Sequence, residues 1–212
     1  MLTLYDYLPS QNAYKIRLLL NHLNQPYQSK FVSIFEGEGQ IAAYREISPT
    51  GTVPAIELAD CGTLAESNAI LVYLAEGTDY LPDDAFARGK VLQWLFFEGE
   101  LIQSGIATLR HWVQTGKDKN RSKEAITGKR NLSLKSLQIL NHHLSQNYFL
   151  SGDQYTVADM SVFAYVHLAG EANLPLEKYQ FVVQWIDRVR SQDRFLAETH
   201  PYSLDPNSVG EL

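Results

Sequence analysis

The period of the apolar pattern changes once along this chain, and that change constrains the fold more than any other feature. Residues 1–77 contain short runs with the alternation or the β-branched and aromatic content of strands, and helical stretches separate them. After residue 87 the apolar residues recur at helical spacing. Between these parts, "TDYLPDDAF" contains Pro82 followed by two aspartates and fits neither pattern. We therefore predict two domains, 1–77 and 87–212, joined by a linker over 78–86.

The first domain is predicted to contain its elements in the order βαβ, then α, then ββα. Strands are expected at LTLYDY (2–7), YQSKFVSI (27–34), VPAIEL (53–58) and GTLA (62–65), and helices at 14–23, 41–47 and 66–77. The last two strands are separated by a tight turn and should pair antiparallel. Gly77 stands where the end of a helix favours the left-handed backbone conformation.

The second domain is predicted to be all helical. Amphipathic patterns place helices at 87–113, 125–144, 157–168 and 181–189. At one of the helix starts, Thr156 precedes Asp159 by three residues, which is the spacing of a capping box. Asp159 could be read as a catalytic carboxylate, but its position ahead of an apolar run favours a structural role.

Composition narrows the class of protein and its partners. The formal net charge is −6, and no run of Lys or Arg could neutralise phosphates, so nucleic acid is not an expected partner. The sequence shows no signal peptide and no apolar run long enough to span a membrane, so a cytoplasmic protein is expected. A single cysteine, Cys61, cannot form an internal disulfide. His142 and His143 are adjacent and diverge on a helix, so no metal site is predicted.

Four segments in order carry a family resemblance: SQNAYKIRLLL, GTVPAI, LAESNAILVYLAE and YTVADMSVFAY. Together they resemble the cytosolic glutathione S-transferases, particularly bacterial members with a serine after the first strand. The resemblance implies an α+β fold class, with a thioredoxin-like N-terminal domain that binds glutathione and an all-helical bundle domain that contributes the electrophile pocket. It also implies glutathione as co-substrate and a homodimer; the residue pattern above predicts no metal.

Ser10 is the leading candidate for a catalytic residue. A thiolate is a far better nucleophile than a thiol, whose pKa is about 8.5, so an enzyme that uses glutathione must stabilise the anion. Ser10 precedes the first helix, where free amides and the helix dipole favour negative charge, although a serine there could simply cap the helix. In the resembled family this serine donates its hydroxyl to the sulfur.

Asn12 is the second candidate for the thiol contact. Its amide could hold the thiolate, as in related bacterial enzymes of disulfide-reductase type, or it could cap the helix. Tyrosine is the donor in other branches of the family, but Tyr5 and Tyr7 are expected to pack on the first strand.

The remaining glutathione contacts are assigned by the resemblance. Proline cannot donate to a strand ladder, and in thioredoxin-like domains a cis Val53–Pro54 bond would turn the Val53 backbone toward the ligand. Glu66 and Ser67 start a helix and are expected to bind the γ-glutamyl end. Thr52 stands where many relatives have Lys or Arg, which weakens the contact to the glycyl carboxylate.

Two further assignments each have an alternative. Gln40 could replace the missing cation by hydrogen bonding, or it could face solvent. Phe35, Ile106 and Arg110 are candidates to line the hydrophobic substrate pocket, although such a stripe also fits core or dimer contacts.

The predicted function is conjugation of reduced glutathione to small hydrophobic electrophiles, as in detoxification. Two alternatives remain open. Asn12 suggests glutathione-dependent disulfide or peroxide reduction, whereas Thr52 and the changed pattern of the fourth helix suggest a non-catalytic binding protein of the same fold.

Overall fold

The computed structural model describes residues 1–210 and divides the chain into two compact units. One unit contains Met1–Glu76 together with the described residues from Asp193 onward, and the other contains Gly77–Gln192. The predicted helical domain extended over residues 87–212, whereas the structure groups its described residues from 193 onward, the C-terminal tail, with the first unit. Backbone carbonyls of this tail accept hydrogen bonds from side chains of that unit.

The first unit contains a four-stranded sheet in the order β2-β1-β3-β4. Its elements are β1 (Leu2–Asp6), α1 (Gln11–His22), β2 (Tyr27–Phe31), α2 (Ala42–Arg45), β3 (Ala55–Leu58), β4 (Gly62–Ala65) and α3 (Ser67–Ala75). Strand β1 pairs parallel with β2 and antiparallel with β3, and β3 pairs antiparallel with β4. The predicted order of elements and the antiparallel pairing of the last two strands are confirmed.

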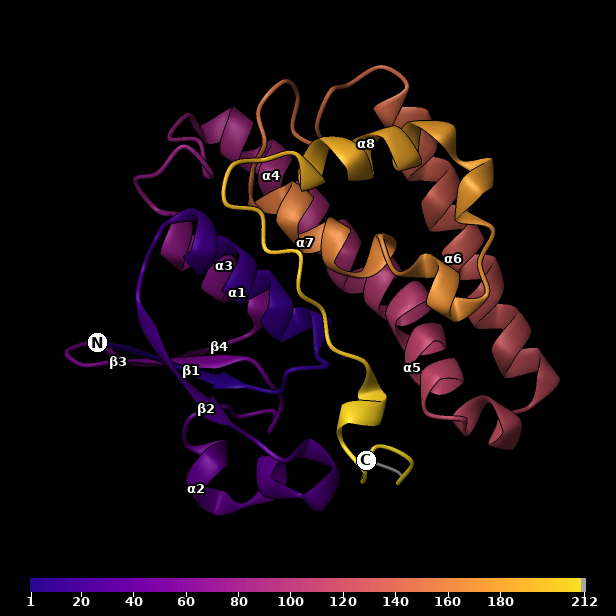
Figure 1. The fold of residues 1–212 in the computed structure, drawn as a ribbon. Coiled ribbons are helices and arrows are strands. Elements are labelled where there is room, and N and C mark those ends of the chain that lie inside the picture. The colour runs from indigo at the N-terminus through magenta and orange to yellow at the C-terminus, as the bar shows by residue number, and fades with distance from the viewer. Residues whose placement is uncertain (211–212) are drawn as a thin grey trace. The chain divides into compact units, whose positions relative to one another are not determined.

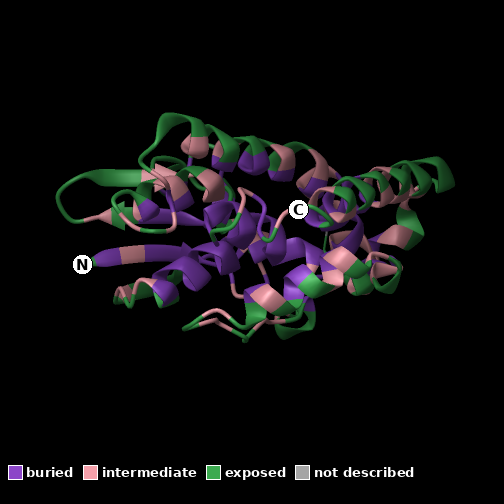
Figure 2. Ribbon diagram, turned by 90° about the horizontal axis from the view of Figure 1, so that it is seen from above, coloured by how far each residue is buried: buried purple, intermediate pink, exposed green. Residues whose placement is uncertain are grey.

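The core of this unit lies around the central strand β1. Leu4 is fully buried, and Figure 2 shows that the strand starting at the N-terminus is almost wholly buried. Helices α1 and α3 lie on one side of the sheet and α2 on the other (Figure 1). Apolar residues on several faces of α1 are buried because the sheet and α3 cover part of the helix and the C-terminal tail runs beside it (Figure 1).

Three side chains of α1 hold the tail. The Tyr14 hydroxyl donates to the Leu196 carbonyl at 2.5 Å, and the Asn21 amide donates to the Arg194 carbonyl at 2.6 Å. His22 Nδ1 lies 2.8 Å from the Asp193 carbonyl oxygen. These bonds satisfy backbone groups of a segment that has no helix or strand of its own between residues 193 and 201.

The second unit is all helical, as predicted. Its helices are α4 (Ala85–Phe97), a π-helical segment (Glu98–Ala107), α5 (Thr108–Gln114), α6 (Lys123–Leu144), α7 (Val157–Val166) and α8 (Gln180–Arg190). The predicted helix 87–113 is continuous but widens in its middle, where the Thr108 amide donates to the Gln103 carbonyl five residues back. The Gln103 side chain donates to the Glu98 carboxylate at 2.8 Å across the same spacing.

The structural role predicted for Asp159 is confirmed. Its Oδ2 accepts from the Thr156 amide at 3.1 Å and completes a capping box at the start of α7. Its Oδ1 accepts from the Leu150 amide at 3.0 Å and from the Trp185 indole at 2.8 Å, so one carboxylate joins the preceding loop, α7 and α8. Burial raises the pKa of Asp159 to about 6.

Among residues 1–210, no helix is both long and apolar enough to cross a membrane.

Candidate functional site

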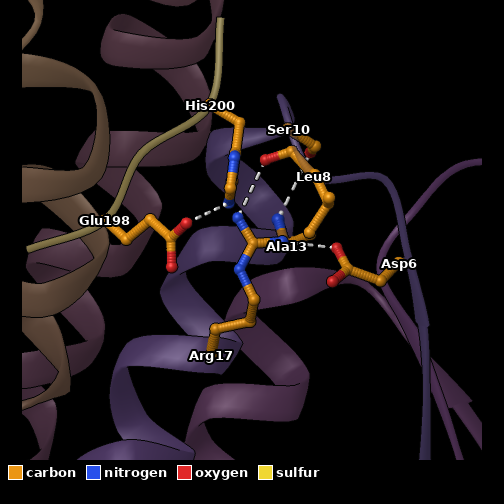
Figure 3. Close-up of polar contacts among 7 residues, drawn as sticks. All are labelled: Asp6, Leu8, Ser10, Ala13, Arg17, Glu198 and His200. Carbon is orange, nitrogen blue, oxygen red and sulfur yellow. Dashed lines mark hydrogen bonds and ion pairs between the residues drawn. The ribbon is translucent and has the colours of Figure 1, made fainter. Parts of the chain in front are cut away.

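Ser10 lies at the start of α1, directly after the turn that leaves β1. The Ser10 amide donates to the Tyr7 carbonyl at 2.8 Å and closes this turn. Ser10 Oγ accepts from the Ala13 amide at 3.3 Å and caps the helix (Figure 3), which explains why α1 begins three residues earlier than its apolar pattern predicts. Within residues 1–210 the Ser10 hydroxyl hydrogen has no acceptor, so the hydroxyl can cap the helix and still donate to a ligand.

The starts of α1 and α3 meet through polar side chains. Ser67 Oγ donates to Asn12 Oδ1 at 3.4 Å, and Lys15 Nζ donates to Ser67 Oγ at 3.4 Å. Lys15 is fully buried, so its positive charge lies beneath two helix N-termini. This combination of a cation and two helix starts favours an anionic ligand. Sequence reasoning missed Lys15, although a lysine between the buried Tyr14 and Ile16 was a visible signal.

The predicted cis peptide bond between Val53 and Pro54 is confirmed. The residue before it is held by its backbone, because the Thr52 carbonyl accepts from the Tyr44 hydroxyl and from the Ser48 hydroxyl, each at 2.9 Å. The Thr52 side chain is exposed and lies 2.8 Å from the Thr50 hydroxyl. Thr52 can therefore offer a neutral hydroxyl to a ligand but no charge.

Gln40 lies beside the Thr52 loop because two glycine backbones touch. A Cβ on Gly39 would lie 2.2 Å from the Gly51 carbonyl oxygen, and a Cβ on Gly51 would lie 2.3 Å from the Gly39 carbonyl oxygen. Any residue with a side chain would separate the two loops. Gln40 is exposed, and its Oε1 accepts a hydrogen bond from the Arg45 guanidinium.

Replacing Gly39 by alanine is expected to destabilise the protein by about 1–3 kcal/mol, because the new methyl group forces the Gln40 and Thr52 loops apart. Thermal unfolding measures the loss of stability. Gly89→Ala is the control, since nothing lies within 4 Å of a Cβ at this helical glycine. A Gly39→Ala variant as stable as Gly89→Ala would contradict the importance given to this contact.

Glu66 stands in a strained backbone conformation at the start of α3. Its φ of 70° lies in a region that residues with side chains rarely adopt. Strain of this kind is concentrated at ligand sites, where the surrounding structure maintains it. The Glu66 side chain is exposed and makes no cap hydrogen bond to its own helix. Glu66 is therefore available to a ligand next to Ser67.

The two tyrosines of the first strand region use their hydroxyls inside the protein. Tyr5 donates to Glu57 at 2.8 Å, and burial followed by this carboxylate raises the pKa of Tyr5 to about 12. Tyr7 donates to Asp205 of the tail at 2.9 Å, and burial together with Asp205 raises the pKa of Tyr7 above its ordinary value. Neither phenol is free to donate to a ligand while these bonds exist, in contrast to the Ser10 hydroxyl.

Tyr202 is a further tail residue that the sequence analysis did not predict near this site. It is 9% exposed and packs in a cluster of buried apolar residues of the first unit: Tyr5, Tyr7, Val32, Tyr44, Val53, Ala55 and Tyr202. The tail sequence contains other apolar residues, such as Phe195 and Leu204, so no local signal marked Tyr202 for this cluster.

Comparison with known proteins identifies the family. The model of the glutathione S-transferase N-terminal domain matches residues 9–76, and the model of the C-terminal domain matches residues 106–193. A solved glutathione S-transferase from Pseudomonas fluorescens Pf-5 is 36% identical, with an alignment that covers 92% of this chain and 97% of that one and a TM-score of 0.88. This chain belongs to the cytosolic glutathione S-transferase family.

Two other relatives show the range of functions that the family contains. The disulfide-bond oxidoreductase YfcG of Escherichia coli K12 is 29% identical over 199 residues, which are 91% of each protein. The glutathione transferase URE2P6 of Phanerochaete chrysosporium was solved with oxidized glutathione; it is 25% identical, with coverage of 91% and 92% and a TM-score of 0.80. The predicted thioredoxin-like and all-helical domains of a glutathione S-transferase are thus confirmed.

The three residues predicted for the electrophile pocket of a glutathione S-transferase lie in different units. Phe35, in the first unit, is half-buried, and its ring centroid lies 6.0 Å from that of Tyr7. Ile106, in the second unit, is fully buried. Arg110 is 2% exposed, and its Nε donates to Glu171 at 2.7 Å. The assignment of these residues to a pocket stays a prediction.

Cys61 and the adjacent His142 and His143 are not among the residues of the candidate site. Cys61 is exposed in the turn between β3 and β4. Within the described residues, no three His, Cys, Asp or Glu side chains gather where they could hold a metal ion.

Proposed function

We propose that this protein is a glutathione S-transferase that conjugates reduced glutathione to small hydrophobic electrophiles, with Ser10 as the catalytic residue. The observation that carries the proposal is the Ser10 hydroxyl, which caps α1 through its lone pair and keeps its hydrogen available. The glutathione found in a 25% identical family member supports the choice of co-substrate.

Ser10 would lower the pKa of the bound thiol in two ways. Its hydroxyl donates to the sulfur, and a hydrogen bond to a charged acceptor is worth about 1.5–3 kcal/mol. The N-terminus of α1, a 12-residue helix, adds a favourable dipole. The thiol proton goes to solvent, the sulfur lone pair forms the new C–S bond, and the leaving group or adjacent acceptor atom takes the displaced electron pair.

The rest of the tripeptide would be bound by the neighbouring loops and helix starts. Glu66 would meet the γ-glutamyl ammonium, and the Ser67 backbone amide would meet its carboxylate above the buried charge of Lys15. The Val53 backbone, presented by the cis bond to Pro54, would bind the cysteinyl part.

The glycyl carboxylate of glutathione would meet neutral donors. Gln40 follows Gly39 and Thr52 follows Gly51, and the contact between these two glycine backbones supports a carboxylate site that Gln40 and Thr52 would share. Because neither brings a charge, we expect glutathione affinity in the modest range for this family.

Several further features belong to the same proposal. Phe35, Ile106 and Arg110 contribute to the electrophile pocket, the protein acts in detoxification in the cytoplasm, and it forms a homodimer. Exposed aromatic side chains on α4 support self-association, since Phe86 and Phe96 are 76% and 74% exposed.

Disulfide reduction is the second candidate function. The relative named as a disulfide-bond oxidoreductase favours it, and so does the position of Asn12, whose amide lies at the start of the same helix as Ser10. Asn12 is therefore retained as the alternative residue for the thiol contact.

One experiment separates these functions. Purified protein is passed over immobilised glutathione and then assayed with a haloaromatic, an isothiocyanate and a mixed disulfide. Our proposal expects retention on the column and turnover of a carbon electrophile. Turnover of the mixed disulfide alone would support the reductase, and retention without any turnover would support a binding protein.

A further inference from the structure

Arg17 is a buried cation that connects α1, the end of β1 and the turn between them, which carries Ser10. It projects from the second turn of α1 and is 6% exposed. Its Nη1 lies 2.5 Å from Asp6 Oδ1 at the end of β1, and its Nη2 donates to the Leu8 carbonyl at 2.9 Å. Figure 3 shows the guanidinium between these two acceptors, with Ser10 and its bond to Ala13 on the adjoining backbone.

The geometry of these bonds fixes the turn that carries Ser10. A guanidinium is a rigid planar fork, so two bonds from one group also fix the direction between their acceptors. Leu8 lies inside the turn that the Ser10 amide closes on the Tyr7 carbonyl. The position of Ser10 relative to α1 is therefore held by its own cap and by the Arg17 bond to Leu8.

Burial makes this arrangement stiff. Asp6 is 1% exposed, and separating a buried ion pair leaves an uncompensated charge, which is costly. The Arg17–Asp6 pair therefore has few alternative conformations of low energy. The turn that Arg17 bonds at Leu8 is restricted in the same way.

We propose that Arg17, held by Asp6, is a positioning residue for the Ser10 hydroxyl. This inference rests on the proposed function, because it assigns to Arg17 an effect on the glutathione thiol. Arg17 acts through Ser10: it holds the turn so that the hydroxyl points at the sulfur, and it does not touch substrate itself.

An effect transmitted through Ser10 must disappear when Ser10 is absent. Lysine at position 17 keeps the charge opposite Asp6 but loses the fork that also reaches Leu8. In Arg17→Lys we expect the thiol pKa of bound glutathione to rise by about half a unit to one unit and kcat to fall roughly fivefold to tenfold, with a smaller change in KM for glutathione. In a Ser10→Ala background, Arg17→Lys should change the thiol pKa little further.

Arg88→Lys is the matched control. Arg88 also bonds one backbone carbonyl and one aspartate, with its Nε 2.9 Å from the Pro82 carbonyl oxygen and its Nη2 3.7 Å from Asp83, but it belongs to the second unit. It should leave the thiol pKa unchanged. Asp6→Asn is a second variant that weakens the grip on Arg17 and should move the thiol pKa in the same direction.

Equal losses for Arg17→Lys in the Ser10 and Ser10→Ala backgrounds would overturn the inference, since that pattern indicates a general structural role. An unchanged thiol pKa in Arg17→Lys and Asp6→Asn would overturn it as well. Failure of the proposed function has a different signature, namely a Ser10→Ala single variant whose thiol pKa equals that of the wild type.

Discussion

Replacing Asp159 by alanine is expected to lower the free energy of unfolding by about 3–5 kcal/mol, because four buried donors lose their acceptor together. These donors are the backbone amides of Leu150 and Thr156, the Thr156 hydroxyl and the indole of Trp185. The carboxylate is fully buried, so water cannot replace it. Denaturant unfolding of the two proteins measures the difference.

Asp84→Ala is the matched control for this variant. Asp84 also accepts from two amides at a helix start, at 2.9 Å from Ala87 and 3.1 Å from Phe86, but it is exposed. Its loss should cost about 1 kcal/mol, as for an ordinary helix cap. Equal costs for Asp84→Ala and Asp159→Ala would show that Asp159 is only a cap and joins nothing else.

The Asp159 carboxyl also makes the free energy of unfolding depend on pH, with a contribution that grows as pH falls. Burial raises its pKa to about 6, above the ordinary value of 3.8, so between these values the folded state binds the proton more tightly than the unfolded state does. The stability that this tighter proton binding adds to the folded state is fully present below the unfolded pKa of 3.8. It is lost as pH rises through the folded pKa of about 6. The stability gap between wild type and Asp159→Ala should therefore widen, by roughly 1 kcal/mol from about pH 7 to about pH 5.

Replacing Ser10 by alanine is expected to reduce the conjugation rate at neutral pH roughly 10- to 100-fold, the loss of one hydrogen bond to a charged sulfur. Ser10→Thr keeps a hydroxyl and should retain more of the rate. Steady-state assays with the haloaromatic substrate measure kcat and KM for both variants.

Ser122→Ala controls for the capping function of Ser10. Both serines are N-caps with the same bond, since Ser122 Oγ accepts from the Ala125 amide at 3.2 Å. Both alanine variants should lose about 1 kcal/mol of stability, while Ser10→Ala alone loses activity. A fully active Ser10→Ala, with the Asn12→Ala variant inactive, would transfer the catalytic role to Asn12.

The sequence predicted those features of the fold that depend on neighbouring residues. The strand runs and the capping box of Thr156 and Asp159 follow from residues close together in the chain, whereas the cis bond before Pro54 follows from the family resemblance. The π-helical segment 98–107 could not be predicted. Over ten residues, apolar spacing does not distinguish hydrogen bonds to the fifth residue back from hydrogen bonds to the fourth.

Local patterns predicted which candidate residues lie at helix starts, but not the long-range contacts around them. The sequence pattern correctly placed three candidate residues at helix starts: Ser10, Glu66 and Ser67. The Tyr7 bond to Asp205 joins residues 198 positions apart, and no local pattern marks it. Arg17 and Asp6 are closer in sequence, but a charged pair reads as solvent-facing until the structure shows both residues buried.

The pKa of the glutathione thiol in the bound state tests the central claim most directly. Ultraviolet difference titration of the thiolate in the wild-type complex and in the Ser10→Ala complex gives this value. The account predicts a wild-type pKa well below the free value of about 8.5 and a return toward that value in Ser10→Ala. A wild-type complex that titrates like free glutathione, or a lowered pKa that Ser10→Ala leaves unchanged, would contradict it.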